Sequence, residues 1–182
     1  QIELPDWIGP FLAARQEPLP NISQRMQLAV GLAAENMRRG TGGPFGAVVV
    51  NEATGEPVSV GVNLVTSSRF SVAHAEIVAV TLAQAATGEW NLSRAGPLQL
   101  VTSCEPCAMC YGAVPWSGIA TLAWGARRED AEACGFDEGD KPDDWKKKLK
   151  ARGIVVEADV LREKAAAVLK RYVHSDGTIY NP

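Results

Sequence analysis

Three of the four cysteines in this chain of 182 residues lie within eight positions, in the stretch S-C-E-P-C-A-M-C that begins at Ser103. The apolar run before it is typical of a strand, and we expect a helix after it, with Pro106 in the first turn. Cys107 and Cys110 would share one face of that helix, with their Cβ atoms about 5–6 Å apart. The helix N-terminus favours their thiolate form. The stretch therefore predicts a strand-to-helix corner with two metal ligands, and Cys104 is left to pack at the strand end.

Two thiolates and one imidazole suit zinc, and we expect His74 to supply the imidazole. The chain holds one other histidine, His174, which lies in the C-terminal segment. Three protein ligands leave the fourth tetrahedral position for water, whose pKa zinc lowers toward about 7, as in a catalytic site. Glu76 follows His74 by two residues, so both side chains can approach one metal only beyond the N-terminus of their helix. Ala75 between them is small and lets a ring approach.

A carboxylate beside zinc can take the proton of the bound water and pass it to a ring nitrogen of a substrate, and Glu76 fits this role. Water then adds to the adjacent carbon, and ammonia leaves after a second protonation. The predicted reaction is hydrolytic deamination of an amino-substituted heterocycle. A structural zinc and a redox cysteine pair are the alternatives, and a structural zinc would need Cys104 as its fourth ligand.

Strands and helices alternate along the chain, which is typical of a layered α/β fold. Ser23 is expected to cap the first long helix, and Ser71 is expected to cap a second one that ends at Gly88. We expect one domain over 1–182, with an N-terminal arm at 1–22, a core at 23–173 and a C-terminal tail at 174–182. The expected strands are 44–51, 56–63, 98–103, 119–126 and 154–160, and the expected helices are 23–39, 72–86, 105–114, 143–153 and 162–173.

Charge and hydropathy exclude several classes of protein. The net charge of −3 and the pI of about 5.5 argue against a general nucleic-acid binder. The basic stretch W-K-K-K-L-K-A-R-G favours a solvated helix face over a tRNA site. No apolar run is long enough to span a bilayer, and the first residues do not resemble a signal peptide. We therefore expect a cytoplasmic protein without membrane contact.

The pair of motifs H-A-E and P-C-A-M-C resembles the cytidine deaminase-like superfamily, a family of zinc-dependent deaminases, from about residue 23 to about residue 140. The resemblance implies a three-layer α/β/α sandwich around a mixed five-stranded sheet. It also implies one catalytic zinc per chain, held by His74, Cys107 and Cys110, with Glu76 as proton shuttle.

Within the superfamily, the segments G-G-P-F-G-A-V-V-V and T-S-C-E-P-C-A-M-C-Y-G-A-V-P-W are most similar to bacterial guanine deaminases. The resemblance places Asn63 at the position of a base-binding asparagine. It also maps G-F-D-E onto a segment whose carboxylate serves the leaving amine, and this carboxylate is Glu138. Asp140 is a second candidate, because it would face the same way along an extended segment.

Aromatic residues are candidates to hold the base. Phe45 and Trp116 could sandwich a planar ring, since stacking on a base contributes about 1–3 kcal/mol. The resemblance implies that an aromatic C-terminal tail closes the pocket, often across a swapped homodimer, which makes Tyr180 a lid candidate.

The sequence thus predicts a guanine deaminase that converts a small purine base, guanine, to xanthine and ammonia. A tRNA adenosine deaminase and a deaminase of cytosine or another amino-heterocycle are alternatives of the same fold. A third alternative is a non-catalytic zinc domain used for dimerisation.

Overall fold

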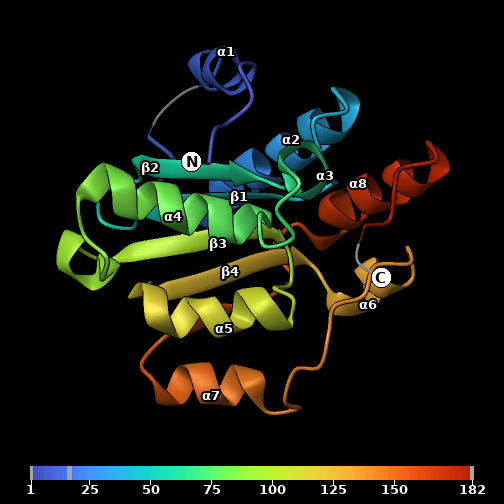
Figure 1. Ribbon diagram of the computed structural model, residues 1–182. Helices are drawn as coiled ribbons and strands as arrows, with labels where there is room; N and C mark the ends of the chain where they lie inside the picture. The colour runs from blue at the N-terminus through green and yellow to red at the C-terminus, as the bar shows by residue number, and fades with distance from the viewer. Residues whose placement is uncertain (1, 16–17, 181–182) are drawn as a thin grey trace.

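The computed structural model describes residues 2–15 and 18–180 (Figure 1). In these residues, five strands form one sheet in the order β2-β1-β3-β4-β5. β1 pairs antiparallel with β2 and β3, while β3 pairs parallel with β4, and β4 with β5. The sheet is therefore mixed, as predicted. The strands are β1 (Gly46–Asn51), β2 (Pro57–Val62), β3 (Leu98–Cys104), β4 (Thr121–Ala126) and β5 (Val155–Glu157).

Helices cover both faces of the sheet, with α4, α5 and α7 on one side and α2 and α8 on the other (Figure 1). This arrangement confirms the predicted three-layer α/β/α fold. Among the described residues, no helix has both the length and the apolar character needed to cross a membrane. The helices are α1 (Ile8–Ala13), α2 (Ile22–Arg38), α3 (Val65–Ser68), α4 (Ala75–Thr87), α5 (Ala108–Ser117), α6 (Arg128–Glu132), α7 (Trp145–Ala151) and α8 (Arg162–His174), with a 3-10 helix η1 (Leu92–Ala95).

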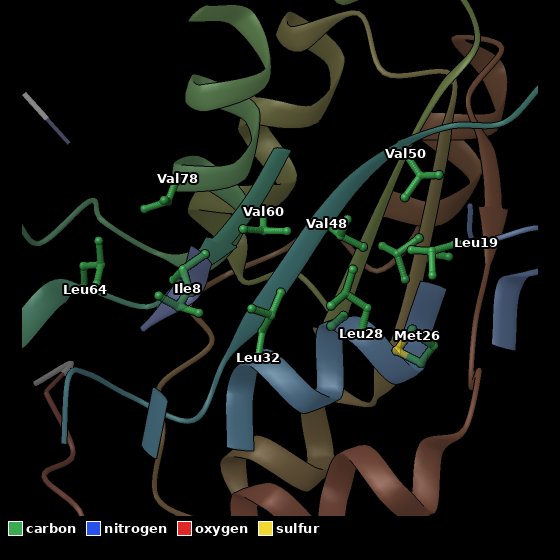
Figure 2. Close-up of a cluster of buried hydrophobic side chains, with 14 of the residues drawn as sticks. Ile8, Leu19, Met26, Leu28, Leu32, Val48, Val50, Val60, Leu64 and Val78 are labelled. Atoms are coloured by element: carbon green, nitrogen blue, oxygen red, sulfur yellow. The ribbon is translucent and has the colours of Figure 1, made fainter. Parts of the chain in front are cut away.

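The inner strand β1, between β2 and β3, is buried on both faces, which explains its unbroken apolar run. Successive side chains of a strand point to opposite faces, so Val48 and Val50 pack with α2 while Ala47 and Val49 pack with α4. Figure 2 shows the first of these layers, where Met26 and other side chains of α2 meet the strand. Each fully buried Val, Leu or Met side chain contributes about 1.5–3 kcal/mol. Packing on both faces thus stabilises the position of this strand in the sheet.

Two helices begin elsewhere than the sequence predicted. Asn21, not Ser23, caps α2, and its side chain accepts a hydrogen bond from the backbone N–H of Gln24 at 3.0 Å. Both residue types are good caps, so the choice between them depends on the backbone that leads into the helix. Ser71 does not cap α4, because His74 occupies the N-cap position. This correction places His74 itself at the N-terminus of its helix.

The corner after β3 also differs in one detail from the prediction. Cys107 is the N-cap of α5, so Pro106 precedes the helix instead of lying in its first turn. Cys110 then lies in the first turn. The two cysteines still meet at the positive end of the helix dipole, which stabilises thiolates.

The basic helix predicted over 143–153 forms as α7, and its lysines are exposed. It is not exposed all round, however, because Trp145 and Leu149 are buried against the sheet. Trp145 packs 5.3 Å from Trp124 of β4, and Lys141 lies over the Trp145 ring at 4.6 Å. The described part of the chain excludes residues 1, 16–17 and 181–182, so the outer ends of the predicted arm and tail lie outside it.

Candidate metal centre and active-site cavity

Two helix N-termini bring the three predicted ligands together. The Nδ1 atom of His74 lies 3.5 Å from the Sγ atom of Cys107 and 3.7 Å from that of Cys110. All three ligand atoms lie within 4.8 Å of one another. Zinc bonds of about 2.0–2.1 Å to nitrogen and about 2.3 Å to sulfur, at tetrahedral angles, would separate nitrogen from sulfur by about 3.6 Å. The donor atoms and their spacing therefore fit a zinc ion.

The two cysteines differ in pKa. The neighbouring Cys110 side chain, together with His74, lowers the pKa of Cys107 to about 4 against the opposing effect of burial. The Cys107 side chain, together with burial, raises the pKa of Cys110 well above its usual range. At neutral pH one ligand is therefore already a thiolate, which is the form that binds a metal.

Cys104 stands apart from the ligands. Among the described residues, the group of possible ligands consists of three members and does not include Cys104. Its Sγ atom lies 3.8 Å from the carbonyl oxygen of Arg127, and its side chain is buried in the cluster that contains Phe136. The packing role predicted for Cys104 agrees with this placement, and a structural zinc with four protein ligands does not.

A cavity opens beside the ligands, with about 320 Å³ of space not filled by atoms, part of which is open to solvent. Besides His74 and Cys107, its lining consists of Phe45, Asn63, Glu76, Cys104, Glu105, Phe136, Glu138 and Tyr180. Cys104 thus borders the cavity although it lies outside the ligand group.

Glu76 lies in the first turn of α4 and is buried. Burial, and next the negative charge of Cys107, raise its pKa to about 7. A carboxyl group with a pKa near the working pH can both take up and release a proton. Its position in the cavity, two residues from His74, matches the place predicted for the proton shuttle.

Glu138 enters the same cavity from the segment after α6, and its side chain is buried. The backbone N–H of Ala108, the first residue of α5, donates to the Glu138 carbonyl at 2.9 Å and ties this segment to the cysteine corner. Burial, and next the charges of Cys107 and Glu76, raise the pKa of Glu138 to about 8. The cavity thus holds two carboxyl groups whose protons can move near neutral pH.

Asp140 does not share this position. It is exposed and is not part of the cavity lining. The sequence argument assumed an extended backbone, but Gly139 has φ of +68°, in the left-handed region. This turn breaks the alternation that would have aimed Asp140 and Glu138 the same way. Asp140 is therefore dropped as a candidate for the second shuttle.

Asn63 follows β2, is buried and lines the cavity. Its Oδ1 atom accepts hydrogen bonds from the backbone N–H groups of Gly43 at 3.4 Å and Val65 at 3.2 Å. Within residues 2–15 and 18–180, its Nδ2 group donates no hydrogen bond. The side chain therefore offers a donor to whatever enters the cavity.

Of the two predicted stacking residues, one lies in the cavity and the other does not. Phe45 lines the cavity, with Phe136 4.9 Å away in an edge-on contact. Trp116 is 85% exposed on α5 and lies outside the lining, so its predicted stacking role is wrong. Sequence reasoning missed Phe136, although it stands in the G-F-D-E segment that pointed to Glu138. Ala75 is buried and is not part of the cavity lining, and its backbone carbonyl lies close to Gly61 of β2.

The C-terminal segment returns to the cavity of its own chain. The Tyr180 ring lines the cavity and lies 5.5 Å from Phe136. Burial raises the pKa of Tyr180 well above its usual range, so its hydroxyl stays protonated at neutral pH. The placement agrees with a lid. Exchange of this tail between two chains stays a prediction.

Residues 20–126 match the family model of the cytidine and deoxycytidylate deaminase zinc-binding region. Among curated relatives, the guanine deaminase of Bacillus subtilis (strain 168) is 41% identical over 113 residues, which are 62% of this chain and 69% of the relative. The tRNA-specific adenosine deaminase of the same organism is 39% identical over 83 residues, and the match covers 46% of this chain and 48% of the relative. Among solved structures, a guanine deaminase from Nitrosomonas europaea aligns with a TM-score of 0.88 at 42% identity, covering 96% of each chain.

Proposed function

We propose that this chain, which belongs to the family of the cytidine and deoxycytidylate deaminase zinc-binding region, hydrolyses guanine to xanthine and ammonia. The single observation that carries the proposal is one cavity that joins a His-Cys-Cys ligand set to two buried carboxyl groups, Glu76 and Glu138. Guanine deamination needs two protons delivered at different points of the base. Two carboxyl groups with raised pKa values supply them.

His74, Cys107 and Cys110 would hold the zinc ion. Zinc supplies a Lewis acid that lowers the pKa of a coordinated water toward about 7 and so makes hydroxide available at neutral pH. Glu76 takes the proton that water loses and delivers it to the ring nitrogen beside the amino-bearing carbon. The protonated ring makes that carbon electrophilic, and the carbon–oxygen bond forms there.

Glu138 serves the other end of the reaction. Its carboxyl group, whose pKa is raised to about 8, gives its proton to the amino group. The carbon–nitrogen bond breaks and ammonia leaves, while the Glu76 carboxylate takes the proton of the new hydroxyl group as the carbonyl forms. After product release Glu76 gives up this proton to solvent and Glu138 takes one back, so no proton is consumed overall. Asn63 donates from its Nδ2 group to an acceptor on the edge of the base, while Phe45 and Phe136 bound the cavity with apolar surface.

The rival within the family is deamination of adenosine in a tRNA loop. The tail favours a free base over it, because Tyr180 lines the cavity beside Phe136, on a segment that would have to share this space with the flanking nucleotides of such a substrate. A non-catalytic zinc domain has no use for two buried carboxyl groups beside the ligands. Dimerisation and a cytoplasmic location stay predictions from the sequence.

The test is a panel of ammonia-release assays on zinc-loaded protein with guanine, adenine, cytosine, cytidine and a tRNA anticodon stem-loop. We expect release from guanine, and xanthine as the second product. Release from the stem-loop, with binding that weakens steeply as salt rises, would favour the tRNA reaction instead. Release from cytosine or cytidine alone would move the proposal to a pyrimidine.

A further inference from the structure

The loop that follows α2, with the sequence G-T-G-G at residues 40–43, runs between two residues of the cavity lining. A Cβ atom on Gly42 would collide with the carbonyl oxygen of Asn63. A Cβ atom on Gly43 would lie 2.5 Å from the ring of Tyr180. Only glycine allows the backbone to approach both so closely. The loop therefore sets the position of Asn63 on one side and seats the tail on the other.

The side chain of Asn36 fixes the conformation of this loop through hydrogen bonds. It lies in the last turns of α2 and is 0% exposed. Its Nδ2 group donates to the carbonyl oxygens of Gly43 at 2.9 Å and Asn63 at 2.8 Å, and its Oδ1 atom accepts from the Thr41 hydroxyl at 2.6 Å. The reverse orientation of the amide would set an oxygen against two carbonyl oxygens. One orientation of Asn36 therefore satisfies all of its partners.

The N-terminal segment completes the chain of hydrogen bonds. Trp7 precedes α1, and its buried side chain donates from Nε1 to the Thr41 hydroxyl at 3.1 Å. The ring is held by Phe11 in an edge-on contact at 5.4 Å. Because Thr41 accepts from Trp7, its own proton is directed to Asn36. Each group in this series therefore donates a hydrogen bond to the next, from Trp7 through Thr41 and Asn36 to the backbone carbonyl of Asn63.

This chain of bonds decides what Asn63 presents to the cavity. With the Gly43 carbonyl held by Asn36, the N–H of Gly43 points to the Oδ1 atom of Asn63, where Val65 also donates. Both bonds occupy the oxygen of the amide and leave its nitrogen for a ligand. A change in the backbone conformation of Gly43 would remove one of the two donors that hold this oxygen and weaken the orientation of the amide.

We propose that Asn36 is a positioning residue for substrate recognition, acting through Asn63, and that Trp7 and Thr41 keep it in the working orientation. The inference rests on the proposed function, since it takes Asn63 to be the residue that recognises the base. The side chains of Trp7, Thr41 and Asn36 bond to one another, Gly43 and Asn63, and not to the metal ligands, Glu76 or Glu138, so loss of the network should leave those groups in place. It therefore weakens binding of the base more than it slows the chemical step.

The experiment compares Asn36→Leu, Thr41→Val and Trp7→Phe with Thr87→Val as the matched control. Thr87 bonds its hydroxyl to the carbonyl of Ala83 at the far end of α4, away from the cavity. KM and kcat for guanine are measured on zinc-loaded protein, with zinc content and thermal midpoint recorded for each variant. We expect Asn36→Leu and Thr41→Val to raise KM about tenfold, the size of one net hydrogen bond, with kcat per zinc-loaded chain nearly unchanged. Trp7→Phe moves KM the same way by less, and Thr87→Val leaves it unchanged.

If the hydrogen-bond network only stabilised the fold, the thermal midpoint of the variants would fall, but the folded variants would keep the KM of the parent. That result in Thr41→Val overturns the inference even if Asn36→Leu does not fold.

Binding of 2,6-diaminopurine, a guanine analogue, to the same variants in a Glu76→Gln background separates the two proposals. Weaker binding in the network variants supports the inference even if the parent releases no ammonia from guanine. Equal binding overturns the inference alone, and a parent that neither binds the analogue nor turns over guanine overturns both.

Discussion

The ammonium of Lys141 lies 2.6 Å from the carboxylate of Glu105, and both side chains are buried. Lys141 also donates to the carbonyl oxygen of Pro106 at 2.7 Å. Glu105 and Pro106 lead into the cysteine corner, whereas Lys141 follows the segment of Glu138. The pair therefore fastens the second carboxyl group to the metal site.

Removal of one partner of this pair should destabilise the fold strongly. Lys141→Met leaves the Glu105 carboxylate buried without its closest cation, which costs about 3–5 kcal/mol. Urea denaturation measures the loss. Lys147→Met is the matched control, because Lys147 is exposed on α7, and it should change stability by less than about 0.5 kcal/mol. The double variant Lys141→Met with Glu105→Gln should recover part of the loss, and equal losses in the two lysine variants would contradict the role of the pair.

Glu76→Gln should keep the metal and abolish turnover. The amide has nearly the same shape but cannot carry a proton between water and the base, so kcat should fall by at least about 10²–10⁴-fold. Zinc content, measured by atomic emission, should stay at one ion per chain. Retained activity would remove Glu76 from the mechanism, and loss of zinc would show instead that its carboxylate supports the ligands.

The cysteines should divide into two classes. Cys107→Ala should lose zinc, because it removes a ligand that is already a thiolate at neutral pH. Cys104→Ala should retain zinc and lose only packing contacts, with a modest fall in stability. Titration of released metal against a colorimetric chelator distinguishes the two. Equal zinc loss in both variants would mean that the site uses Cys104 as well.

The raised pKa of Glu138 predicts a pH-dependent difference in stability between the parent and Glu138→Gln, both metal-free. Burial and the charges of Cys107 and Glu76 raise the pKa from 4.5 to about 8, while Lys141 and His74 oppose the shift. The folded protein therefore holds a proton that the unfolded chain has lost above about pH 4.5. This contribution is fully present below that pH and is lost as the pH rises through about 8. Relative to the parent, Glu138→Gln should thus gain stability between pH 5 and pH 8, as followed by urea denaturation, and a constant difference would contradict the burial of an ionising carboxyl group.

Much of the metal site could be predicted from the sequence, because its residues occur in two short motifs whose spacing determines their local geometry. Cys107 and Cys110 belong to one corner, and His74 and Glu76 to one helix start, so short-range geometry places them. The two motifs were linked because the other histidine, His174, lies in the C-terminal segment, and the mixed five-stranded sheet was implied by the resemblance, whereas the strand order was not predicted.

What the sequence could not predict depends on contacts between distant segments. Trp116 is as apolar as Phe136, but the packing of α5 turns it to solvent, while the turn after α6 turns Phe136 into the cavity. Asp140 was misplaced because the left-handed Gly139 is not recognisable as such in a run of acidic residues. Asn36 gave no signal, since Thr41 and Gly43 meet it through the fold of the loop after α2, and Asn63 becomes its neighbour only when β2 pairs with β1.

The unequal pKa values of Cys107 and Cys110 have a consequence for how the protein must be handled. A thiolate at neutral pH attacks alkylating reagents and oxidants, and here a second thiol stands beside it to complete a disulfide. The thiolate form that makes Cys107 a good metal ligand also makes the metal-free cysteine pair sensitive to oxidation. Loss of metal during purification would therefore be followed by oxidation, and only preparations kept under reductant would take zinc back.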